Sequence, residues 1–535
     1  MRHVSLEMVN NAVHSQGLDA PDLAFVKNSL LDYITRTYGP NAQDQADPPN
    51  VQNKLTQTLT YLFVALYGEG WETFFDDFLA LTSSQNGGTR DNLSGVMLYL
   101  RILSSVHDEI ADLMISRQGN ESKRNNDLKD LIRERHMQKI AMSWQDILAQ
   151  WTNKHDGVVE LTLKVIGKWV SWIDISLVVS QDMQNLILPL VGRTGSTNNN
   201  IDTVRDTAID TLTEIVAKKM GPSHKMELIS FLNLGGIITE LLASQGLNEF
   251  KGTNRYDNDL AEVVAKLLNT ILTDVVRVLE DNKVDAETRA KAERHLQDFL
   301  PALLRLFSDE YDEVCSTVIP SLTDLLTFLR RVGTLPDTYS QMLRPILSAI
   351  VAKMRYDETS SWGTEDAESE EADFQELRKR LQILQKSVAA VDQTLYIEFL
   401  STLVGNMFAT LEQQGPSMDW RDLDLALHEI YLFGELALPN AGLAHKSEPN
   451  AVATERLAVM MSKMVESGKM IYPFCTRSAG FPANNFDRHC ELPPSSNSSP
   501  VHGDLRPLPC LLRGAPPIYR SCTRKLRSPH SPRAP

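Results

Sequence analysis

The chain has 535 residues, of which 42% are hydrophobic and 23% are charged. This composition is typical of globular proteins and excludes a chain that is disordered throughout. A single core rarely grows beyond about 250–300 residues, so we expect several domains or an array of repeats. The net charge of −16 repels nucleic acid over the surface as a whole, which disfavours bulk binding to DNA or to anionic membranes.

No run of apolar residues in the sequence is long enough to predict a membrane span. Even the most apolar early stretch, residues 61–81, is interrupted by four acidic residues. The first residues lack the unbroken apolar core of a secretory signal. We therefore expect a soluble protein of a reducing compartment, without membrane insertion and without disulfides.

Helical periodicity is the main signal in residues 1–468. Apolar residues recur at helical spacing, for example within 55–66 and 264–279, and strand-like alternation is nearly absent. The helical segments pair at a spacing near 40 residues, which is the period of HEAT or armadillo repeats. The pairs are 53–67 with 71–82, 93–115 with 124–151, 158–179 with 182–191, 201–219 with 223–243, 258–280 with 286–307, and 310–331 with 337–355.

We therefore predict an all-α fold, a HEAT/armadillo-like superhelix of helical hairpins (an α-solenoid) over residues 1–468. The best local match to the HEAT pattern begins at Asp202, with Val204 and Arg205 in the expected positions. An α-solenoid buries a continuous core between neighbouring repeats and leaves a long concave face for a large ligand.

The segment 469–535 has a different composition. It holds 12 of the 25 prolines, four of the five cysteines, and 10 Lys and Arg residues against 3 Asp and Glu residues. Such a sequence buries too little apolar surface to offset its ordering entropy. We expect a Pro/Ser/Arg-rich tail that is disordered or aberrantly translated. The alternative is a basic tail for RNA binding or nuclear import. The four cysteines form no CxxC pair, which argues against a zinc site.

A search for catalytic motifs finds no constellation that predicts an enzyme, a cofactor or a metal. His428 and Glu429 begin a string like HExxH, but Leu432 stands where the second zinc ligand would be, so His428 is expected on a helix surface. Cys315 follows two acidic residues, which favours a buried structural cysteine over a reactive one.

Two clusters of charge remain as candidate functional residues. Residues 357–376 form an acidic loop with nine acidic and no basic residues, either simply solvated or in contact with a basic partner. Its candidate contact residues are Glu365, Asp366, Glu368, Glu370, Glu371 and Asp373. A basic run lies earlier in the chain, either laced with ion pairs or in contact with an RNA backbone. Its candidate residues are Lys123, Arg124, Lys129, Arg133, Arg135 and Lys139.

Several segments resemble the exportin-T family of nuclear export receptors. They are VMLYLRIL at 96–103, RNNDLKDLIRE at 124–134, VSWIDISL at 170–177 and KMRYD at 353–357. The resemblance spans residues 1–468 in order and spacing. Members of that family are about twice this long, so we expect a chain that is truncated at both ends.

The resemblance implies a karyopherin that binds tRNA cooperatively with the GTP form of the Ran GTPase, contacts nucleoporins, and shuttles between nucleus and cytoplasm. Two alternatives stay open at this stage. One is a karyopherin for protein cargo, and the other is a HEAT scaffold or adaptor with no role in transport.

Overall fold

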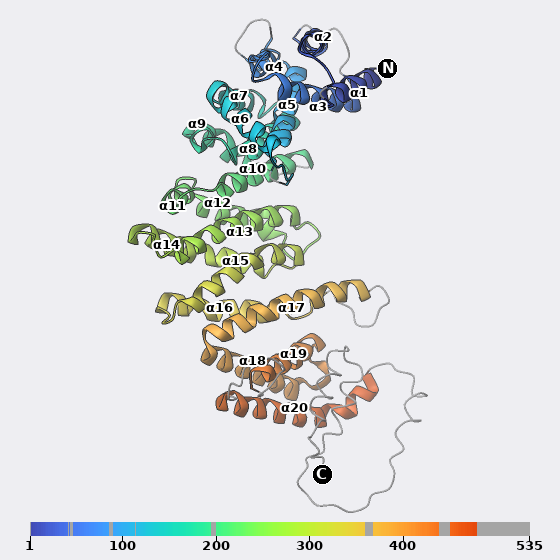
Figure 1. Ribbon diagram of the computed structural model, residues 1–535. Helices are drawn as coiled ribbons and strands as arrows, with labels where there is room; N and C mark the ends of the chain where they lie inside the picture. The colour runs from blue at the N-terminus through green and yellow to red at the C-terminus, as the bar shows by residue number, and fades with distance from the viewer. Residues whose placement is uncertain are drawn as a thin grey trace, which may run out of the picture. The chain divides into compact units, whose positions relative to one another are not determined.

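The computed structural model describes residues 2–15, 17–40, 42, 47–84, 89–112, 114–193, 199–358, 367–437 and 450–478. Every regular element within these ranges is a helix (Figure 1). The prediction of an all-α fold is confirmed. The chain divides into two compact units, unit 1 over Met1–Leu306 and unit 2 over Phe307–Pro535.

Unit 1 begins with seven helices within the described residues. These are α1 (Arg2–His14), α2 (Ala20–Tyr38), α3 (Pro49–Leu66), α4 (Phe74–Ala80), α5 (Leu93–Ile110), α6 (Asn120–Arg135) and α7 (Met137–Trp151). The unit continues with α8 (Asp156–Val170), α9 (Gln181–Val191), α10 (Asn199–Ala217), α11 (Pro222–Phe231), α12 (Leu234–Leu242), α13 (Asn258–Glu280) and α14 (Ala286–Phe307). Short helical turns lie at Ile175–Leu177 and Gln245–Glu249.

One row of helices in unit 1 stacks in the order α1, α3, α5, α8, α10, α13, each in contact with the next. Their apolar faces form the core of the unit, with side chains such as Leu59, Leu103 and Leu268 fully buried. Ion pairs join successive helices of this row at its surface. Lys54 of α3 lies 2.8 Å from Glu7 of α1, and Lys168 of α8 lies 2.8 Å from Asp108 of α5. In both pairs a lysine of the later helix binds a carboxylate of the helix before it in the row.

The hairpin pairing differs from the predicted one by one helix. The sequence pairs 158–179 with 182–191 and 201–219 with 223–243. Among helices adjacent in sequence, however, α8 packs more on α7 than on α9, and α10 packs more on α9 than on α11. Periodicity identifies each helix and its apolar face. It does not say which neighbour covers that face, because the α-solenoid offers a partner on either side.

The HEAT-like match at Asp202 is a structural junction between repeats. Arg205 is buried, and its guanidinium lies 2.8 Å from Asp206 and 3.0 Å from Asp257. Asp257 also caps the first turn of α13, since its side chain accepts a hydrogen bond from Leu260 N at 3.0 Å. The arginine therefore links α10 to the start of the next helix in the stack.

Two helices that the sequence predicts as continuous are broken in the structure. The segment 124–151 becomes α6 and α7, which meet at His136, a buried residue outside helical geometry. The segment 223–243 becomes α11 and α12, separated at Asn233, whose φ of 49° is left-handed. Asparagine adopts this conformation at a low cost among non-glycine residues, and it ends the helix.

Unit 2 holds α15 (Asp312–Arg331), α16 (Asp337–Lys353), α17 (Ala367–Val391), α18 (Gln393–Gln414), α19 (Trp420–Ala437) and α20 (Ala451–Ser478), with a short turn at Gly415–Ser417. Helix α17 packs on α15 and α16, and α18 packs on α19 and α20. Helix α20 continues to Ser478, beyond the predicted end of the helical region at residue 468. The rest of the predicted tail, residues 479–535, lies outside the described residues.

Helix α18 is the one helix in the described part of the chain that is long and apolar enough to span a membrane by length and composition alone. The sequence-based search for apolar runs passed over it. Its residues Tyr396, Leu400 and Phe408 are buried within unit 2, against α19 and α20 among others. One third of the apolar stretch is buried (33%), and a single helix that meets these criteria is weak evidence for a membrane span.

Candidate functional site

The basic run lies on α6 and the start of α7. Helix α6 is strongly polar, and only Asn125, Leu128 and Ile132 of its residues are buried. Helix α6 packs on α5 and α7, and its other residues are exposed or partly exposed. The six basic residues differ sharply in what they contact.

Arg133 and Arg135 are bound to the carboxyl ends of other helices. Arg133 donates to the carbonyl oxygen of Trp172 from Nε at 3.0 Å and from Nη2 at 2.9 Å, and its guanidinium lies 5.4 Å from the Trp172 ring. Arg135 donates to the carbonyl oxygen of Tyr67 at 3.4 Å. Cations are favoured at such positions because the carbonyl end of a helix carries partial negative charge.

Arg124 and Lys139 are paired with carboxylates. Arg124 lies 3.7 Å from Glu109 and 3.9 Å from Glu121, and Lys139 lies 3.0 Å from Asp76. All of these side chains are partly exposed. Pairs of this kind contribute about 0–1 kcal/mol and exchange their partners easily.

Lys123 and Lys129 have no ion pair within the described residues. Lys123 is exposed. Lys129 is half-buried, and its pKa lies below the ordinary lysine value because of burial and the nearby Arg133 charge. These two lysines are therefore the members of the basic run whose side-chain donors are free for an external anion. The predicted contact of the whole run with RNA stays a prediction.

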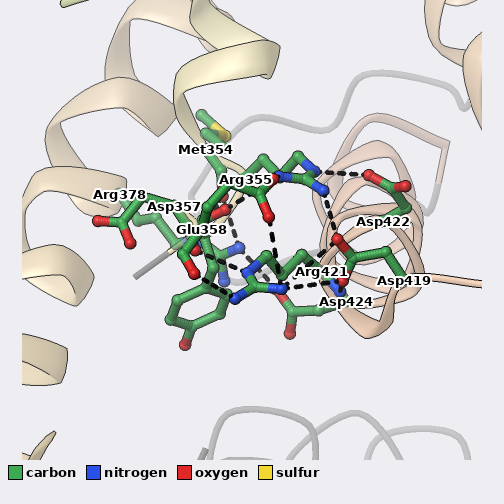
Figure 2. Close-up of polar contacts among 10 residues, drawn as sticks. Met354, Arg355, Asp357, Glu358, Arg378, Asp419, Arg421, Asp422 and Asp424 are labelled. Atoms are coloured by element: carbon green, nitrogen blue, oxygen red, sulfur yellow. Dashed lines mark hydrogen bonds and ion pairs between the residues drawn. The ribbon is translucent and has the colours of Figure 1, made fainter. Parts of the chain in front are cut away.

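The acidic segment begins at a network of arginines that closes the end of α16. Arg355 lies 2.6 Å from Asp422, 2.7 Å from Asp419 and 2.8 Å from Glu358 (Figure 2). Arg421 of α19 donates to the carbonyl oxygens of Asp357 at 2.6 Å and Glu358 at 2.8 Å. The first two residues of the segment are thus fixed to α19 by backbone contacts.

The other end of the acidic segment is held at the same place. Tyr356 lies against the rings of Phe374 and Trp420, at 4.6 and 5.2 Å between centroids. Arg378 of α17 is buried, donates to the carbonyl oxygen of Met354 at 2.8 Å from Nε, and lies 2.6 Å from Asp424 (Figure 2). Both ends of the segment therefore meet at a rigid base.

The predicted acidic loop is shorter than expected, because α17 begins at Ala367. The backbone of Glu368, Glu370, Glu371 and Asp373 therefore belongs to a helix. Glu365 and Asp366 lie outside the described residues.

Sequence reasoning missed the three arginines of this base. Arg355, Arg378 and Arg421 bind carboxylates or carbonyl groups far away in the sequence, such as Asp422 for Arg355. The spacing of residues in the sequence does not predict such a contact. The only available signal was the presence of isolated arginines beside the acidic segment.

Comparison with known proteins identifies the family. The chain is 95% identical over 473 residues to Exportin-T of Neurospora crassa, which covers 88% of this chain and 46% of that protein. The chain belongs to the exportin-T family. Exportin-T of Chaetomium globosum and of Podospora anserina are each 71% identical over 468 residues. This family member spans about half the length of the relatives it matches.

Family models and solved structures agree with this assignment. The Exportin-T model matches residues 286–482 of this exportin-T family member, and the model of Exportin 1-like proteins matches residues 48–212. The structure titled "Importin13 cytosolic state" aligns with a TM-score of 0.58 at 14% identity, and covers 83% of this chain and 51% of that chain. At this identity the match shows the fold alone, and it confirms the predicted α-solenoid.

The prediction that His428 of the HExxH-like string lies on a helix surface is wrong. His428 of this exportin-T family member is buried at 6% exposure, not on a helix surface, and burial lowers the pKa of its imidazole to about 3. The reason is that α19 is covered by α18 and α20 and also reaches α17, where Gln385 donates to Glu429 at 2.6 Å. A helix enclosed on several sides has no surface face at this position.

Cys315 is fully buried, as predicted, and burial raises the pKa of its thiol to about 12. A thiol in this state is a poor nucleophile at neutral pH. Within the described residues of this exportin-T family member, no group of three His, Cys, Asp or Glu side chains is placed to hold a metal ion.

Proposed function

We propose that this chain is part of a nuclear export receptor that binds tRNA together with the GTP form of the Ran GTPase. The observation that carries the proposal is the 95% identity to Exportin-T over 88% of the chain. The receptor would shuttle between nucleus and cytoplasm and contact nucleoporins on the way. It would act by binding alone, without a catalytic centre or a cofactor.

The surface chemistry supports recognition of RNA by its backbone. The paired strands of tRNA are A-form, which proteins recognise by shape and by phosphate contacts more than by base edges. A net charge of −16 leaves this task to local cations. Lys123 and Lys129 are free for phosphates, and the partly exposed pairs of Arg124 and Lys139 can exchange a carboxylate for a phosphate at little cost.

Cooperative loading follows from linkage. If Ran in its GTP form favours the same arrangement of helices as tRNA does, each ligand strengthens the binding of the other by the same factor. The test is a gel shift of tRNA with this chain, which compares Ran bound to GTP with Ran bound to GDP across a salt series. We expect a shift with the GTP form only, weakening steeply as salt rises.

A protein-cargo karyopherin or a scaffold would give different results. A partner that survives ribonuclease treatment would indicate protein cargo. A partner whose binding ignores the nucleotide on Ran would indicate a scaffold. The absence of any tRNA shift with this chain would contradict the proposal for these residues.

Charge reversal tests the basic run. Reversing Lys123, Arg124, Lys129 and Arg133 together should reduce tRNA affinity, but Arg133 also caps α8, so its loss affects stability as well. The sharper variant is Lys123→Glu with Lys129→Glu, since neither lysine has an ion-pair partner among the described residues. We expect a loss of at least tenfold at low salt and a smaller salt slope. Lys154→Glu with Lys283→Glu is the matched control. An equal loss of affinity in the two double variants would show that the basic run is only solvated and does not contact tRNA.

The acidic segment is the proposed contact for a basic partner. Its base is rigid, because Arg355 and Arg421 fix its first residues to α19. A charged element on a fixed base loses less entropy on binding than a free one. Replacing Glu368, Glu370, Glu371 and Asp373 by the matching amides should weaken the binding of Ran in its GTP form, measured without RNA. Unchanged binding of Ran would show that the acidic segment is only solvated and does not contact this partner.

A further inference from the structure

The connection between α12 and α13 carries basic residues that the sequence analysis did not single out. Its residues 250–256, FKGTNRY, hold Lys251 and Arg255 and no acidic residue. Both side chains are exposed, and neither has an ion pair within the described part of the chain. We call residues 250–256 the Phe250 loop.

The guanidinium of Arg255 lies 3.9 Å from the centroid of the Phe250 ring. Phe250 is half-buried and Arg255 is exposed, so the ring lies on the side of the guanidinium that faces the protein. A planar cation held on an aromatic ring keeps its outer face and its N–H donors available. Arg133 and Arg205 of unit 1 differ, because their N–H groups are bound to a carbonyl oxygen and a carboxylate oxygen, respectively.

The backbone of the Phe250 loop is fixed by its own hydrogen bonds. Thr253 N donates to Phe250 O at 3.0 Å, and Tyr256 N donates to Thr253 O at 3.1 Å. The hydroxyl of Thr253 also donates to Phe250 O at 2.7 Å. Gly252 has a φ of +76°, which side chains disfavour, so the turn depends on glycine.

Both flanks of the loop are tied to the rest of unit 1. Arg305 donates to the carbonyl oxygen of the buried Leu247 at 2.7 Å, and the side chain of Asp257 lies 3.0 Å from Arg205. Asp257, which directly follows the loop, is thereby paired with an internal partner, and Glu249, which directly precedes the loop, accepts a hydrogen bond from Gln245 at 3.0 Å. The stacked arginine is preorganised on a rigid scaffold, which lowers the entropy lost on binding.

We propose that the Phe250 loop contacts unpaired nucleotides of an RNA. Arg255 stacks on a base from its outer face, and Lys251 faces an adjacent phosphate. Bases exposed in single-stranded regions stack on aromatic rings and on arginine planes, and this mode needs no particular sequence. The inference rests on the proposed tRNA-binding function and assigns to it a site for the unpaired parts of that RNA.

The test compares Arg255→Ala and Arg255→Lys with Arg294→Ala, which removes an equal charge from an exposed arginine on α14. Affinities are measured for tRNA with Ran in its GTP form, and for a blunt RNA duplex without unpaired bases. Arg255→Ala should weaken tRNA binding about tenfold, the range expected for one lost stacked base. Arg255→Lys should lose a similar factor with an unchanged salt slope, because lysine keeps the charge but not the plane.

The control Arg294→Ala should stay within about twofold of the unmodified chain, and duplex binding should change little in any variant. Thermal melts confirm that each variant is folded. A tRNA affinity of Arg255→Ala equal to that of Arg294→Ala overturns the inference. Full recovery in Arg255→Lys also overturns it, since charge alone would then suffice.

The outcomes separate this inference from the proposed function. A GTP-dependent tRNA shift with the unmodified chain supports the proposed function, whatever the Arg255 variants do. If Arg255→Ala instead weakens the binding of Ran in the absence of RNA, the loop contacts a protein and the inference is wrong. No shift with the unmodified chain contradicts both.

Discussion

Glu429 of α19 is a fully buried residue whose carboxyl group is strongly perturbed by burial. Gln385 of α17 donates its amide N–H to Glu429 Oε2 at 2.6 Å, while Oε1 of each residue has no hydrogen-bond partner among the described residues. Two unpaired acceptors on one hydrogen-bonded pair indicate that the carboxyl group of Glu429 is protonated, since it can then donate a hydrogen bond to Gln385. Burial raises the pKa of Glu429 to about 7, in agreement with this state.

The pH dependence of stability follows from this shift. The pKa of Glu429 is higher in the folded chain than its ordinary value of 4.5, so the folded state binds the extra proton between these values. The free energy of unfolding of unit 2 should therefore fall as pH rises from about 4.5 to about 7, by at most about 1.4 kcal/mol per pH unit from this group.

Urea denaturation across this pH range measures the effect. Glu429→Gln should remove the Glu429 part of the slope and be more stable than the unmodified chain at pH 8. Glu412→Gln, at an exposed position of α18, is the control and should keep the slope. The same slope in the chain with Glu429→Gln would show that another group is responsible.

Among the helices, the recurring feature is a basic side chain that binds the carbonyl groups at a helix end. Arginine and lysine side chains from neighbouring elements bind the last carbonyl groups of several helices in unit 1. Arg117 donates to Asp108 O at 2.7 Å, Arg289 to Leu279 O at 2.8 Å, and Lys218 to Val170 O at 2.9 Å. Each such contact contributes about 0.3–1 kcal/mol. This use of cations explains why so few of them remain for an anionic ligand.

Close packing of α4 and α5 depends on Gly95. A Cβ placed on this residue would fall on the carbonyl oxygen of Leu81, at the end of α4. Gly95→Ala should therefore destabilise unit 1 by about 1–3 kcal/mol, because backbone must move to make room. Gly192→Ala is the control, since no atom lies within 4 Å of its Cβ position. A shift of the urea midpoint in Gly95→Ala no larger than in the control would contradict this reason.

At the scale of the whole molecule, repeats contact their neighbours along the chain, as expected for an α-solenoid. Helix α10 contacts α8 and α13, and α18 contacts α19 and α20. Stability in such arrays is a sum of repeat and nearest-neighbour contributions, so a local defect stays local. The division at Leu306 marks the place where two sets of contacts separate.

Hydrogen exchange measures this independence. Gly95→Ala should increase amide exchange within residues 2–306 and leave residues 307–478 unchanged. Glu429→Gln at pH 8 should slow exchange in α17 and α19 and leave unit 1 unchanged. Changes in both units from either substitution would show that the two units unfold together.

The amino-acid sequence alone predicts the all-α class of the fold and the family resemblance. Each depends on local information, such as the spacing of Leu55 and Leu59 or the segment at 124–134, and the structure and the relatives confirm them. The burial of Cys315 also followed from its neighbours in sequence.

Contacts in the folded chain decide which side chains are free. Arg133 is occupied by a carbonyl at residue 172, while Lys129, four positions earlier on the same helix, has no ion-pair partner in the described residues. His428 is buried because other helices cover α19, and Arg255 stacks on Phe250 because a turn at Gly252 reverses the chain. Contacts between distant segments set these outcomes, and periodicity carries no information about them.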